Sequence, residues 1–254
     1  MELNLRGKTV LVTGGSKGIG LGCCRVFAEE GCHVVMNYRS DEESAQRNAK
    51  ELENVASVKV WVMKADVSIE QEVESLYRRL DEKGIKLDFL VNNAANTKVR
   101  PTPFQEMTTK DWRRDQEGTL NSAFFVSRAF VKRAVEEKRA AAIVNIVSKS
   151  AFLSSSIYNS PYVAAKGGLA ALTRAMVKEL IQYRIRVNAL IPGYVKTEHN
   201  YIDGDARTEE KRKLLPLGEF ATPYDMGNAA TFLCSDRARQ MNGVILDCTG
   251  GTMV

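Results

Sequence analysis

Three side chains in the second half of the chain have the types and the spacing that chemistry on a carbonyl group requires. Tyr162 and Lys166 are four residues apart in a helix-favouring stretch, and Ser148 precedes them. Because residues four apart lie on one face of a helix, the Lys166 ammonium is expected beside the Tyr162 ring. A tyrosine ordinarily titrates near pH ~10, and a neighbouring positive charge lowers this pKa. The pattern predicts that Tyr162 donates or accepts a proton while Ser148 hydrogen-bonds the reacting oxygen.

A glycine-rich turn near the N-terminus is the second motif that points to carbonyl chemistry. It is needed because a tyrosine and a lysine four residues apart are also common as a solvated pair on a helix surface. A buried, β-branched strand at 8–13 runs into Gly14-Gly-Ser-Lys-Gly18-Ile-Gly20, and a helical pattern follows through Glu30. Glycines let the backbone approach a pyrophosphate, and the N-terminus of a helix presents free N–H groups to an anion. The order of strand, glycine turn and helix predicts a dinucleotide site.

This turn also satisfies the G-x-S-x-G pattern of serine hydrolases, with Ser16 as the nucleophile. A hydrolase needs a histidine base late in the chain, and the two histidines here are His33 and His199. His33 comes too early, and His199 lies in a charged stretch with no evident orienting partner. Hydrolysis is therefore the less favoured interpretation.

Hydrophobic periodicity indicates that strands and helices alternate along the whole chain. Such alternation predicts a single-domain, doubly wound parallel sheet of the Rossmann type over 1–254, with about seven strands, helices on both faces and ligands at the carboxyl edge. A charged, irregular segment at about 194–220, with a short helix near 206–214, interrupts the pattern. Strands are expected at about 8–13, 33–37, 58–64, 87–91, 141–147, 185–190 and 243–248, and helices at about 18–30, 41–54, 69–83, 108–136, 159–182 and 223–235.

Composition excludes several classes of protein. No apolar run approaches the roughly 20 residues of a membrane span, and the first residues lack the apolar core of a signal peptide. Five cysteines without C-x-x-C spacing indicate reduced thiols, with Cys23 and Cys24 as small buried hydrophobes. Two histidines give a metal site little support. The net charge is +5, but the basic residues are interspersed with acidic residues along the chain rather than gathered in one stripe. This distribution favours an anionic cofactor or substrate over nucleic acid. We expect a cytoplasmic protein without nucleic-acid, membrane or metal partners.

Taken together, five motifs resemble the short-chain dehydrogenase/reductase family, and in particular its 3-oxoacyl-(acyl-carrier-protein) reductase-like members. The matches follow the family order over nearly the whole chain. They are Thr13-Gly14-x-x-x-Gly18-x-Gly20, Asn92-Asn93-Ala94-Ala95, Ser148, Tyr162-x-x-x-Lys166 and Pro192-Gly193-x-x-x-Thr197. The resemblance implies a nicotinamide cofactor, hydride exchange with a carbonyl or secondary alcohol, a substrate lid at about 194–220 and a homotetramer.

The resemblance also implies roles for individual residues. Lys166 would lower the pKa of Tyr162 and bind the nicotinamide ribose, and Asp66 would accept a hydrogen bond from the adenine amino group. As an alternative to that role, Asp66 could cap the next helix, for which Ser68 is the better candidate. The implied cofactor-binding residues are Gly14, Ser16, Lys17, Gly18, Ile19, Gly20, Tyr38, Arg39, Ser40, Asp66, Val67, Asn93, Ala94, Ala95, Tyr162, Lys166, Pro192, Gly193, Val195 and Thr197.

The residues that end the second strand indicate which nicotinamide cofactor is used. Enzymes that prefer NAD usually place Asp or Glu there to bind the ribose hydroxyls, whereas this chain has Met36-Asn37-Tyr38-Arg39-Ser40. Arg39, together with Lys17 in the glycine turn, would pair with the 2′-phosphate. We therefore expect NADP(H) rather than NAD(H).

Three departures from the family pattern bear on activity. Ala95 replaces a glycine, which disfavours a positive φ there. Counting on from Trp112, Thr119 occupies the usual position of a catalytic asparagine, and Asn121 lies over half a helical turn away. We expect a working but altered proton relay at Thr119. The gap between Ser148 and Tyr162 is one residue longer than usual, and we expect the extra residue to loop out at 154–156.

The substrate is open. Aromatic residues at four positions could line a pocket for an apolar or ring-shaped substrate: Phe152, Tyr158, Tyr194 and Tyr201. Lys211, Arg212 and Lys213 could favour an acidic, carrier-linked acyl chain, although a solvated helix face is the favoured interpretation of these cations. The resemblance points to a 3-oxoacyl thioester, a sterol-like ketone or another small-molecule ketone. A cofactor-sensing binding protein without turnover is the alternative function.

Overall fold

A fully parallel sheet forms the centre of the protein. The computed structural model describes residues 2–96, 101–153, 157–198, 200–201 and 203–253. The strands lie in the order β3-β2-β1-β4-β5-β6-β7 and every neighbouring pair is parallel. This arrangement confirms the predicted Rossmann-type fold. The strands are β1 (Thr9–Val12), β2 (His33–Tyr38), β3 (Val60–Lys64), β4 (Phe89–Asn92), β5 (Ala141–Ile146), β6 (Ile185–Pro192) and β7 (Ile245–Cys248).

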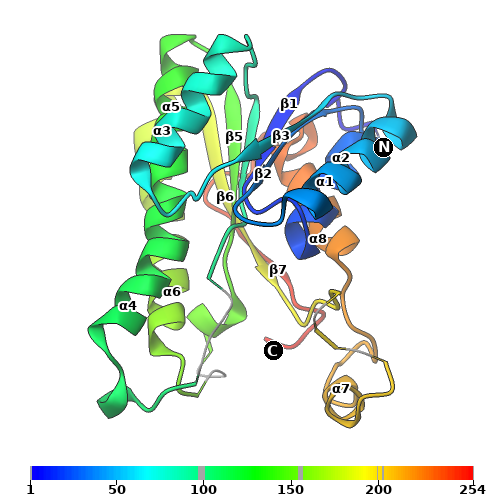
Figure 1. Cartoon of the computed structure of the whole chain (residues 1–254), viewed down its shortest axis with the longest axis vertical. Coiled ribbons are helices and arrows are strands. Elements are labelled where there is room, and N and C mark those ends of the chain that lie inside the picture. The colour runs from blue at the N-terminus through cyan, green and yellow to red at the C-terminus, as the bar shows by residue number, and fades with distance from the viewer. Residues whose placement is uncertain (1, 97–100, 154–156, 199, 202, 254) are drawn as a thin grey trace.

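Helices cover both faces of the sheet. Figure 1 shows α1, α2 and α8 on one side and α3, α4, α5 and α6 on the other. The lid segment, residues 194–220, carries α7 beyond the carboxyl edge of the strands, near the C-terminus of the chain (Figure 1). The helices are α1 (Gly18–Glu29), α2 (Glu42–Ala56), α3 (Glu70–Glu82), α4 (Thr109–Asp115), α5 (Ser122–Glu136), α6 (Ser160–Leu180), α7 (Ala206–Arg212) and α8 (Pro223–Cys234).

The central strands form because their residues suit complete burial. All residues of β1, β4 and β5 are buried, as near-continuous apolar runs in the middle of a parallel sheet require. Cys23 and Cys24 of α1 are buried in the apolar layer on one face, as predicted. Burial raises the pKa of Cys23 to about 12, so this thiol stays protonated.

One predicted helix is interrupted. The sequence pattern indicates a continuous helix over 108–136, whereas the structure ends α4 at Asp115, continues as a π-helix over Gln116–Asn121 and resumes as α5. A π-helical turn inserts one residue into the α-helical repeat and is frequent at functional sites. The helical periodicity of the sequence did not reveal this turn.

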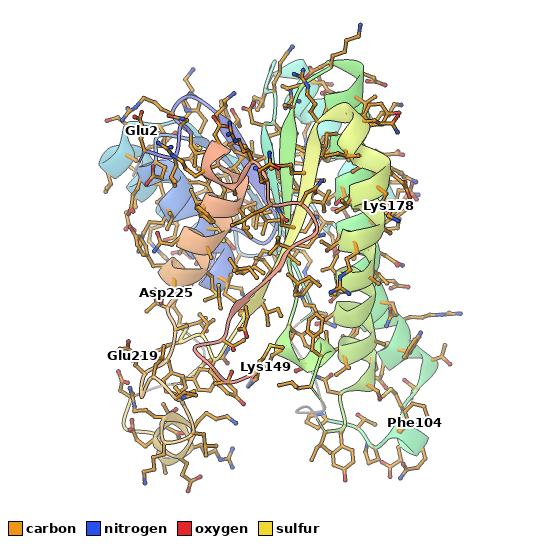
Figure 2. All side chains as sticks on the ribbon, turned by 180° about the vertical axis from the view of Figure 1, so that it is seen from behind. Glu2, Phe104, Lys149, Lys178, Glu219 and Asp225 are labelled. Carbon is orange, nitrogen blue, oxygen red and sulfur yellow. The ribbon has the colours of Figure 1, made fainter. Side chains whose placement is uncertain are left out.

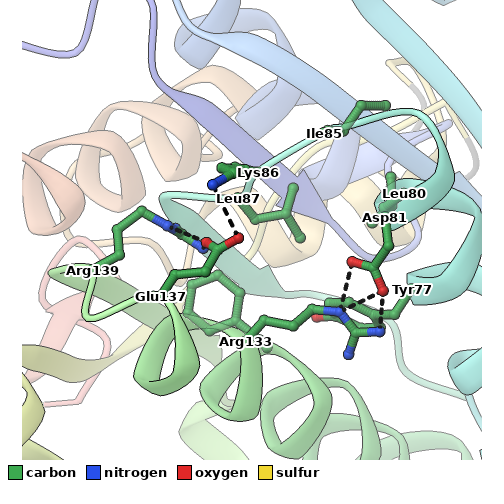
Figure 3. Close-up of a pocket in the computed structure, with 10 residues that line it drawn as sticks. Tyr77, Leu80, Asp81, Ile85, Lys86, Leu87, Arg133, Glu137 and Arg139 are labelled. Atoms are coloured by element: carbon green, nitrogen blue, oxygen red, sulfur yellow. Dashed lines mark hydrogen bonds and ion pairs between the residues drawn. The ribbon is translucent and has the colours of Figure 1, made fainter.

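Within the described part of the chain, no helix is both long and apolar enough to cross a membrane. A cavity of about 20 Å³ lies between α3 and α5, where Arg133 pairs with Asp81, and Arg139 and Lys86 both pair with Glu137 (Figure 3). Its residues Leu87 and Arg139 precede β4 and β5. The cavity therefore lies at the amino edge of the sheet, away from the motifs that suit chemistry.

Candidate active site

The candidate site forms where the strand order reverses, between β1 and β4. Chains that leave these two strands turn to opposite faces of the sheet, which opens a crevice at their carboxyl ends. Thr13 Oγ1 accepts hydrogen bonds from the N–H groups of Asn93 and Ala94, each at 3.0 Å. The Asn93 Nδ2 group donates back to the carbonyl oxygens of Thr13 at 2.9 Å and Gly14 at 3.2 Å. These bonds hold the glycine turn against the end of β4.

The glycine turn has the shape that a dinucleotide phosphate requires. Gly14 and Gly18 have φ of 61° and 54°, and a Cβ atom on Gly20 would lie 2.2 Å from the Gly14 carbonyl oxygen. Lys17, at the N-cap of α1, makes no side-chain cap, and the first turn of α1 holds no acidic residue. The N–H groups of this turn are thus available to an anion. Among the described residues, a Cβ atom on Gly18 would meet Thr197 Cγ2, at 3.7 Å, so the structure brings these two predicted cofactor-binding segments together.

Two asparagines that the sequence analysis did not single out hold the turn in place. Asn37, in β2, is buried and accepts a hydrogen bond from the Gly14 N–H at 3.2 Å, while its Nδ2 group donates to the Ala65 carbonyl at 3.0 Å. Asn48, in α2, donates to the Ser16 carbonyl at 2.9 Å. An amide side chain inside the apolar strand His33–Tyr38 was the available signal for Asn37.

The ends of β2 and β3 bring the predicted adenosine-binding residues together. Arg39 Nη1 lies 3.9 Å from Asp66 Oδ2, and the Arg39 side chain is 65% exposed. Asp66 Oδ1 accepts hydrogen bonds from the Ser68 N–H at 3.0 Å and the Ser68 hydroxyl at 2.6 Å. The proposed N-cap role of Ser68 is therefore wrong, because Ile69 occupies the N-cap of α3 without a side-chain cap. The Ser68 hydroxyl instead fixes the Asp66 carboxylate.

Ser148 and Tyr162 lie close together at the carboxyl end of β5, the strand beside β4. Ser148 follows β5 as the N-cap of a 3₁₀ turn, Lys149–Ala151, and Tyr162 lies in the first turn of α6. Burial raises the pKa of Tyr162, and the negative charge of Asp115 adds to this effect, whereas a hydrogen bond with Ser148 acts in the opposite direction. The net shift is upward, so the phenol is a protonated group at neutral pH.

Lys166 lies deeper than the sequence pattern indicates. It is 2% exposed, and Nζ donates to the Ile146 carbonyl of β5 at 2.5 Å. Nζ is 5.9 Å from the centre of the Tyr162 ring. Burial lowers the pKa of Lys166 to about 7. The structure therefore gives no support to the expectation that Lys166 lowers the pKa of Tyr162, because the amine is desolvated and directed to a backbone carbonyl, and this role stays a prediction.

Thr119 lies in the π-helical turn and is fully buried. Its carbonyl oxygen accepts a hydrogen bond from the Ser122 hydroxyl at 3.1 Å, and among the described residues its own hydroxyl has no partner. Asp115, one turn earlier, is 1% exposed and accepts a hydrogen bond from Asn96 Nδ2 at 3.1 Å. The second Asp115 carboxylate oxygen has no partner in the described chain. The sequence analysis missed Asp115, whose only signal was an acidic residue within a helix that packs against α6.

The departure at Ala95 does not require unusual backbone. Ala95 is not among the described non-glycine residues with positive φ. Its methyl group therefore imposes no left-handed strain. The predicted loop-out at 154–156 lies outside the described residues.

The four predicted substrate-pocket residues separate into two groups. Phe152 and Tyr158 line a cavity of about 450 Å³, and Tyr158 has a φ of 61° just before α6. Tyr194 and Tyr201 lie instead in the lid segment, where their ring centres are 5.9 Å apart and Tyr201 stacks on Phe220 at 4.5 Å. The structure does not place all four around one cavity.

The segment that follows β6 is held by the C-terminal strand. The Gly193 N–H donates to the Cys248 carbonyl at 3.3 Å, and a Cβ atom on Gly193 would lie 2.8 Å from Thr249 Cα. Val195 is buried and pairs with Ala221. The backbone from Pro192 to Thr197 thus follows the carboxyl edge of the sheet toward Gly18.

The hydrolase alternative finds no support in this geometry. Ser16 is 5% exposed and its carbonyl is bound by Asn48. His33 lies at the start of β2, where Nδ1 accepts a hydrogen bond from the Lys59 N–H at 3.1 Å. His199 lies outside the described residues.

Comparison with known proteins assigns the family. The family model described as enoyl-(acyl carrier protein) reductase matches residues 14–253. The chain is 33% identical over 251 residues to 3-oxoacyl-(acyl-carrier-protein) reductase FabG of Chlamydia pneumoniae, and the match covers 99% of each chain. It belongs to the short-chain dehydrogenase/reductase family.

Other relatives of this chain bear the names of different activities. The chain is 34% identical over 251 residues to 3beta-hydroxysteroid dehydrogenase 1 of Eggerthella lenta, covering 98% of this chain and 94% of that protein. A crystal structure of a putative gluconate dehydrogenase from Agrobacterium tumefaciens superimposes with a TM-score of 0.91 at 34% identity, covering 100% of this chain and 98% of that one. The family assignment therefore leaves the substrate undetermined.

The buried amine predicts a stability that depends on pH. The pKa of Lys166 is about 7 in the folded chain and near ~10.4 when unfolded, so the unfolded state binds more protons between these values. Lys166→Met removes the free-energy cost of burying this amine below its unfolded pKa. We expect the variant to exceed the wild type in free energy of unfolding by roughly 2–4 kcal/mol at pH 6, with the gain shrinking as the pH rises toward 10.

Urea unfolding at pH 6, 8 and 10 measures this difference. Lys178→Met is the control, since Lys178 is exposed on the same helix. A stability gain in Lys166→Met that stays constant with pH would show that the amine is not desolvated as described.

The charge of Asp115 predicts a shift in the pH profile. Because this carboxylate contributes to the raised pKa of Tyr162, Asp115→Asn is expected to lower that pKa. Oxidation of an alcohol, which needs the deprotonated phenol, should then begin at lower pH than in the wild type. The measurement is kcat/KM for alcohol oxidation against pH, with Glu117→Gln as an exposed acid of the π-helical turn for comparison. Equal shifts in both variants would contradict a specific role for Asp115.

Proposed function

We propose that this chain is an NADP(H)-dependent oxidoreductase that interconverts a carbonyl group and a secondary alcohol, with Tyr162 as the general acid or base. The observation that carries the proposal is the placement of Tyr162 beside Ser148 at the carboxyl edge of the sheet, close enough for the Ser148 hydroxyl to affect the pKa of the phenol. The glycine turn on the same edge fits a dinucleotide phosphate. When bound, the nicotinamide would supply or accept hydride, which no side chain of the protein can do.

The side chains of the site handle the proton. With its raised pKa, Tyr162 remains a neutral phenol near pH 7 and can donate its proton to a developing alkoxide. Ser148 hydrogen-bonds the same oxygen and stabilises the charge on it. Lys166, with a pKa of about 7, exists in both protonation states at neutral pH and can take up and release a proton. We propose that its amine also binds the ribose hydroxyls of the cofactor.

Two buried polar residues at the π-helical turn support a role in proton transfer. Thr119 lies within the turn, and Asp115 directly precedes it. Both have buried oxygen atoms without a partner in the described chain. A buried oxygen of this kind is costly unless a water or ligand group binds it. We propose that an ordered water at Thr119 takes the place of the usual asparagine contact in the proton relay.

The charges at the end of β2 support a preference for NADP(H). Arg39 is exposed, and its contact with Asp66 is long, at 3.9 Å. Asp41, the nearest carboxylate beyond it in sequence, caps α2 by accepting a hydrogen bond from the Ser44 N–H. Hydrogen bonds from Ser44 and, less strongly, the charge of Lys17 lower the pKa of Asp41, which puts Lys17 near the same edge. A 2′-phosphate there would meet two cations.

The substrate we propose is a small or carrier-linked carbonyl compound. Relatives of this chain bear the names of a 3-oxoacyl reductase, a hydroxysteroid dehydrogenase, a glucose dehydrogenase and a D-beta-hydroxybutyrate dehydrogenase. We further propose that 1–254 forms one dinucleotide-binding and catalytic domain with a substrate lid at 194–220. The homotetramer stays a prediction of the resemblance, and the cytoplasmic location stays a prediction of the composition.

Tyr162→Phe tests the reaction. Removing the proton donor without changing the ring should lower kcat for ketone reduction by NADPH about 10²- to 10⁴-fold and weaken NADPH binding far less. Ser148→Ala should lower kcat by about 10²-fold. Steady-state rates over a panel of ketones and 3-oxoacyl thioesters, with fluorescence titration of NADPH, provide both readouts. Tight NADPH binding with no turnover of any substrate would favour the cofactor-sensing alternative.

Arg39→Ala tests the cofactor preference. Loss of one charge-assisted contact to the 2′-phosphate should raise the dissociation constant for NADPH about 10-fold and leave that for NADH unchanged. Arg47→Ala is the control, because it removes the same charge from α2, where Arg47 bonds to Ser44. An equal loss for NADPH and NADH would contradict 2′-phosphate recognition by Arg39.

A further inference from the structure

Two lysines from separate parts of the chain converge on one tyrosine at the mouth of the site. Lys149 Nζ lies 3.7 Å from the centre of the Tyr194 ring, and Lys211 Nζ lies 4.5 Å from it. Lys149 belongs to the 3₁₀ turn that follows β5, and Lys211 belongs to α7 in the lid segment. Figure 2 shows Lys149 between the lid, marked by Glu219, and the opposite wall, marked by Phe104. The favoured interpretation of Lys211 as part of a solvated helix face is therefore wrong.

Lys149 and Lys211 lack an acidic partner in the described chain, in contrast to two other cations near them, Lys196 and Arg212. Lys196 and Arg212 both pair with Asp203, and Arg212 also pairs with Glu209 at 3.2 Å. No Asp or Glu of the described chain lies within ion-pair distance of Lys149 or Lys211. Two like charges held close together without a counter-ion repel each other, and an anion between them relieves that repulsion.

The ionisation of Tyr194 is consistent with a positive potential at this point. Burial alone would raise the pKa of the Tyr194 phenol, but the hydrogen bonds and charges of Lys149 and Lys211 outweigh it, and the pKa is lowered. The same positive charges that lower the pKa of the Tyr194 phenol would attract a bound carboxylate. The ring also holds the two amines on a fixed platform, because it packs edge-on against Tyr201.

The cluster lies next to the reacting groups along the chain. Lys149 directly follows Ser148, and Tyr194 directly follows Gly193. Adjacent residues have Cα atoms only about 3.8 Å apart, so the cluster and the reacting groups branch from the same two backbone segments, and one substrate molecule could reach both. The cavity of about 450 Å³ lined by Phe104, Phe152 and Val163 also carries polar groups such as Gln105 and Asn159, and it has room for the uncharged remainder of such a substrate.

We propose that Lys149, Lys211 and Tyr194 form a carboxylate-binding subsite and that the substrate is a small oxo acid or hydroxy acid. This proposal rests on the proposed function and narrows its substrate class. Each ammonium donates a charge-assisted hydrogen bond to the carboxylate. Because Lys211 comes from the lid segment and Lys149 from the turn after β5, a bound carboxylate would link the two.

Matched substrates separate this subsite from the catalytic machinery. The probes are 3-oxohexanoate and its methyl ester, which share a carbon chain and differ in charge, together with a 3-oxohexanoyl thioester. We expect the wild type to prefer the free acid over the ester at least 10-fold in kcat/KM. Lys149→Met and Lys211→Met should each lower kcat/KM for the acid about 10- to 100-fold and that for the ester less than about 2-fold. Lys213→Met, an exposed cation that ends the same lid helix, is the charge-matched control and should change neither.

Several results would overturn the proposal. Equal rates for acid and ester, a preference for the thioester, or equal losses on both substrates in the lysine variants would each show that no carboxylate is recognised here. If no probe is reduced at all, calorimetric titration of the NADPH-bound protein with hexanoate decides the subsite independently of the reaction. Binding that weakens at least 10-fold in Lys149→Met and Lys211→Met supports it, and binding that is absent or unchanged overturns it.

Discussion

The hydrogen bonds between Thr13 and Asn93 are the constraint on which the site depends. They join the ends of β1 and β4 at the point where the chain changes from one face of the sheet to the other. Neither strand could supply the site alone. The glycine turn follows β1, whereas Asn93 follows β4 and Ser148, beside Tyr162, follows β5. These bonds also give partners to the backbone groups that they join, which buried N–H and carbonyl groups require. Asn37 of β2 and Asn48 of α2 likewise bind the backbone of the glycine turn through their side-chain amides.

Around this rigid edge, the protein keeps several polar groups in positions that cost stability. Lys166 is buried with a single carbonyl partner, and oxygen atoms of Asp115 and Thr119 are buried without any in the described chain. Burying an amine or carboxylate in this way is unfavourable, and a fold selected for stability alone would place apolar residues there. The pKa of about 7 for Lys166 is the direct consequence of that burial. A group poised near neutral pH exchanges protons readily, so the same burial that weakens the fold suits proton transfer.

Much of the fold could be predicted from the sequence because it rests on local patterns. The buried strands read as short apolar runs, and the glycine turn and the Tyr162 motif depend on spacing within a few residues. Features set by distant partners could not be predicted. The π-helical turn packs Gly118 so closely against Asn96 that a Cβ atom would lie 3.1 Å from the Asn96 side chain. Likewise, helical spacing puts Lys166 on the face of Tyr162, but only the position of β5 explains why the amine turns to Ile146.

The charges of the lid show how the same residue types acquire different roles from their neighbours. Along α7, Arg212 lies over the Phe220 ring and is neutralised by Asp203 and Glu209, which fixes the lid segment internally. Lys211, one residue earlier, points to another face of the same helix and meets the Tyr194 ring. Because adjacent helical residues lie about 100° apart around the axis, a run of three cations cannot act as one patch. Arg212 stabilises the lid segment by itself, whereas Lys211 is left with a charge that only a ligand or another part of the chain can neutralise.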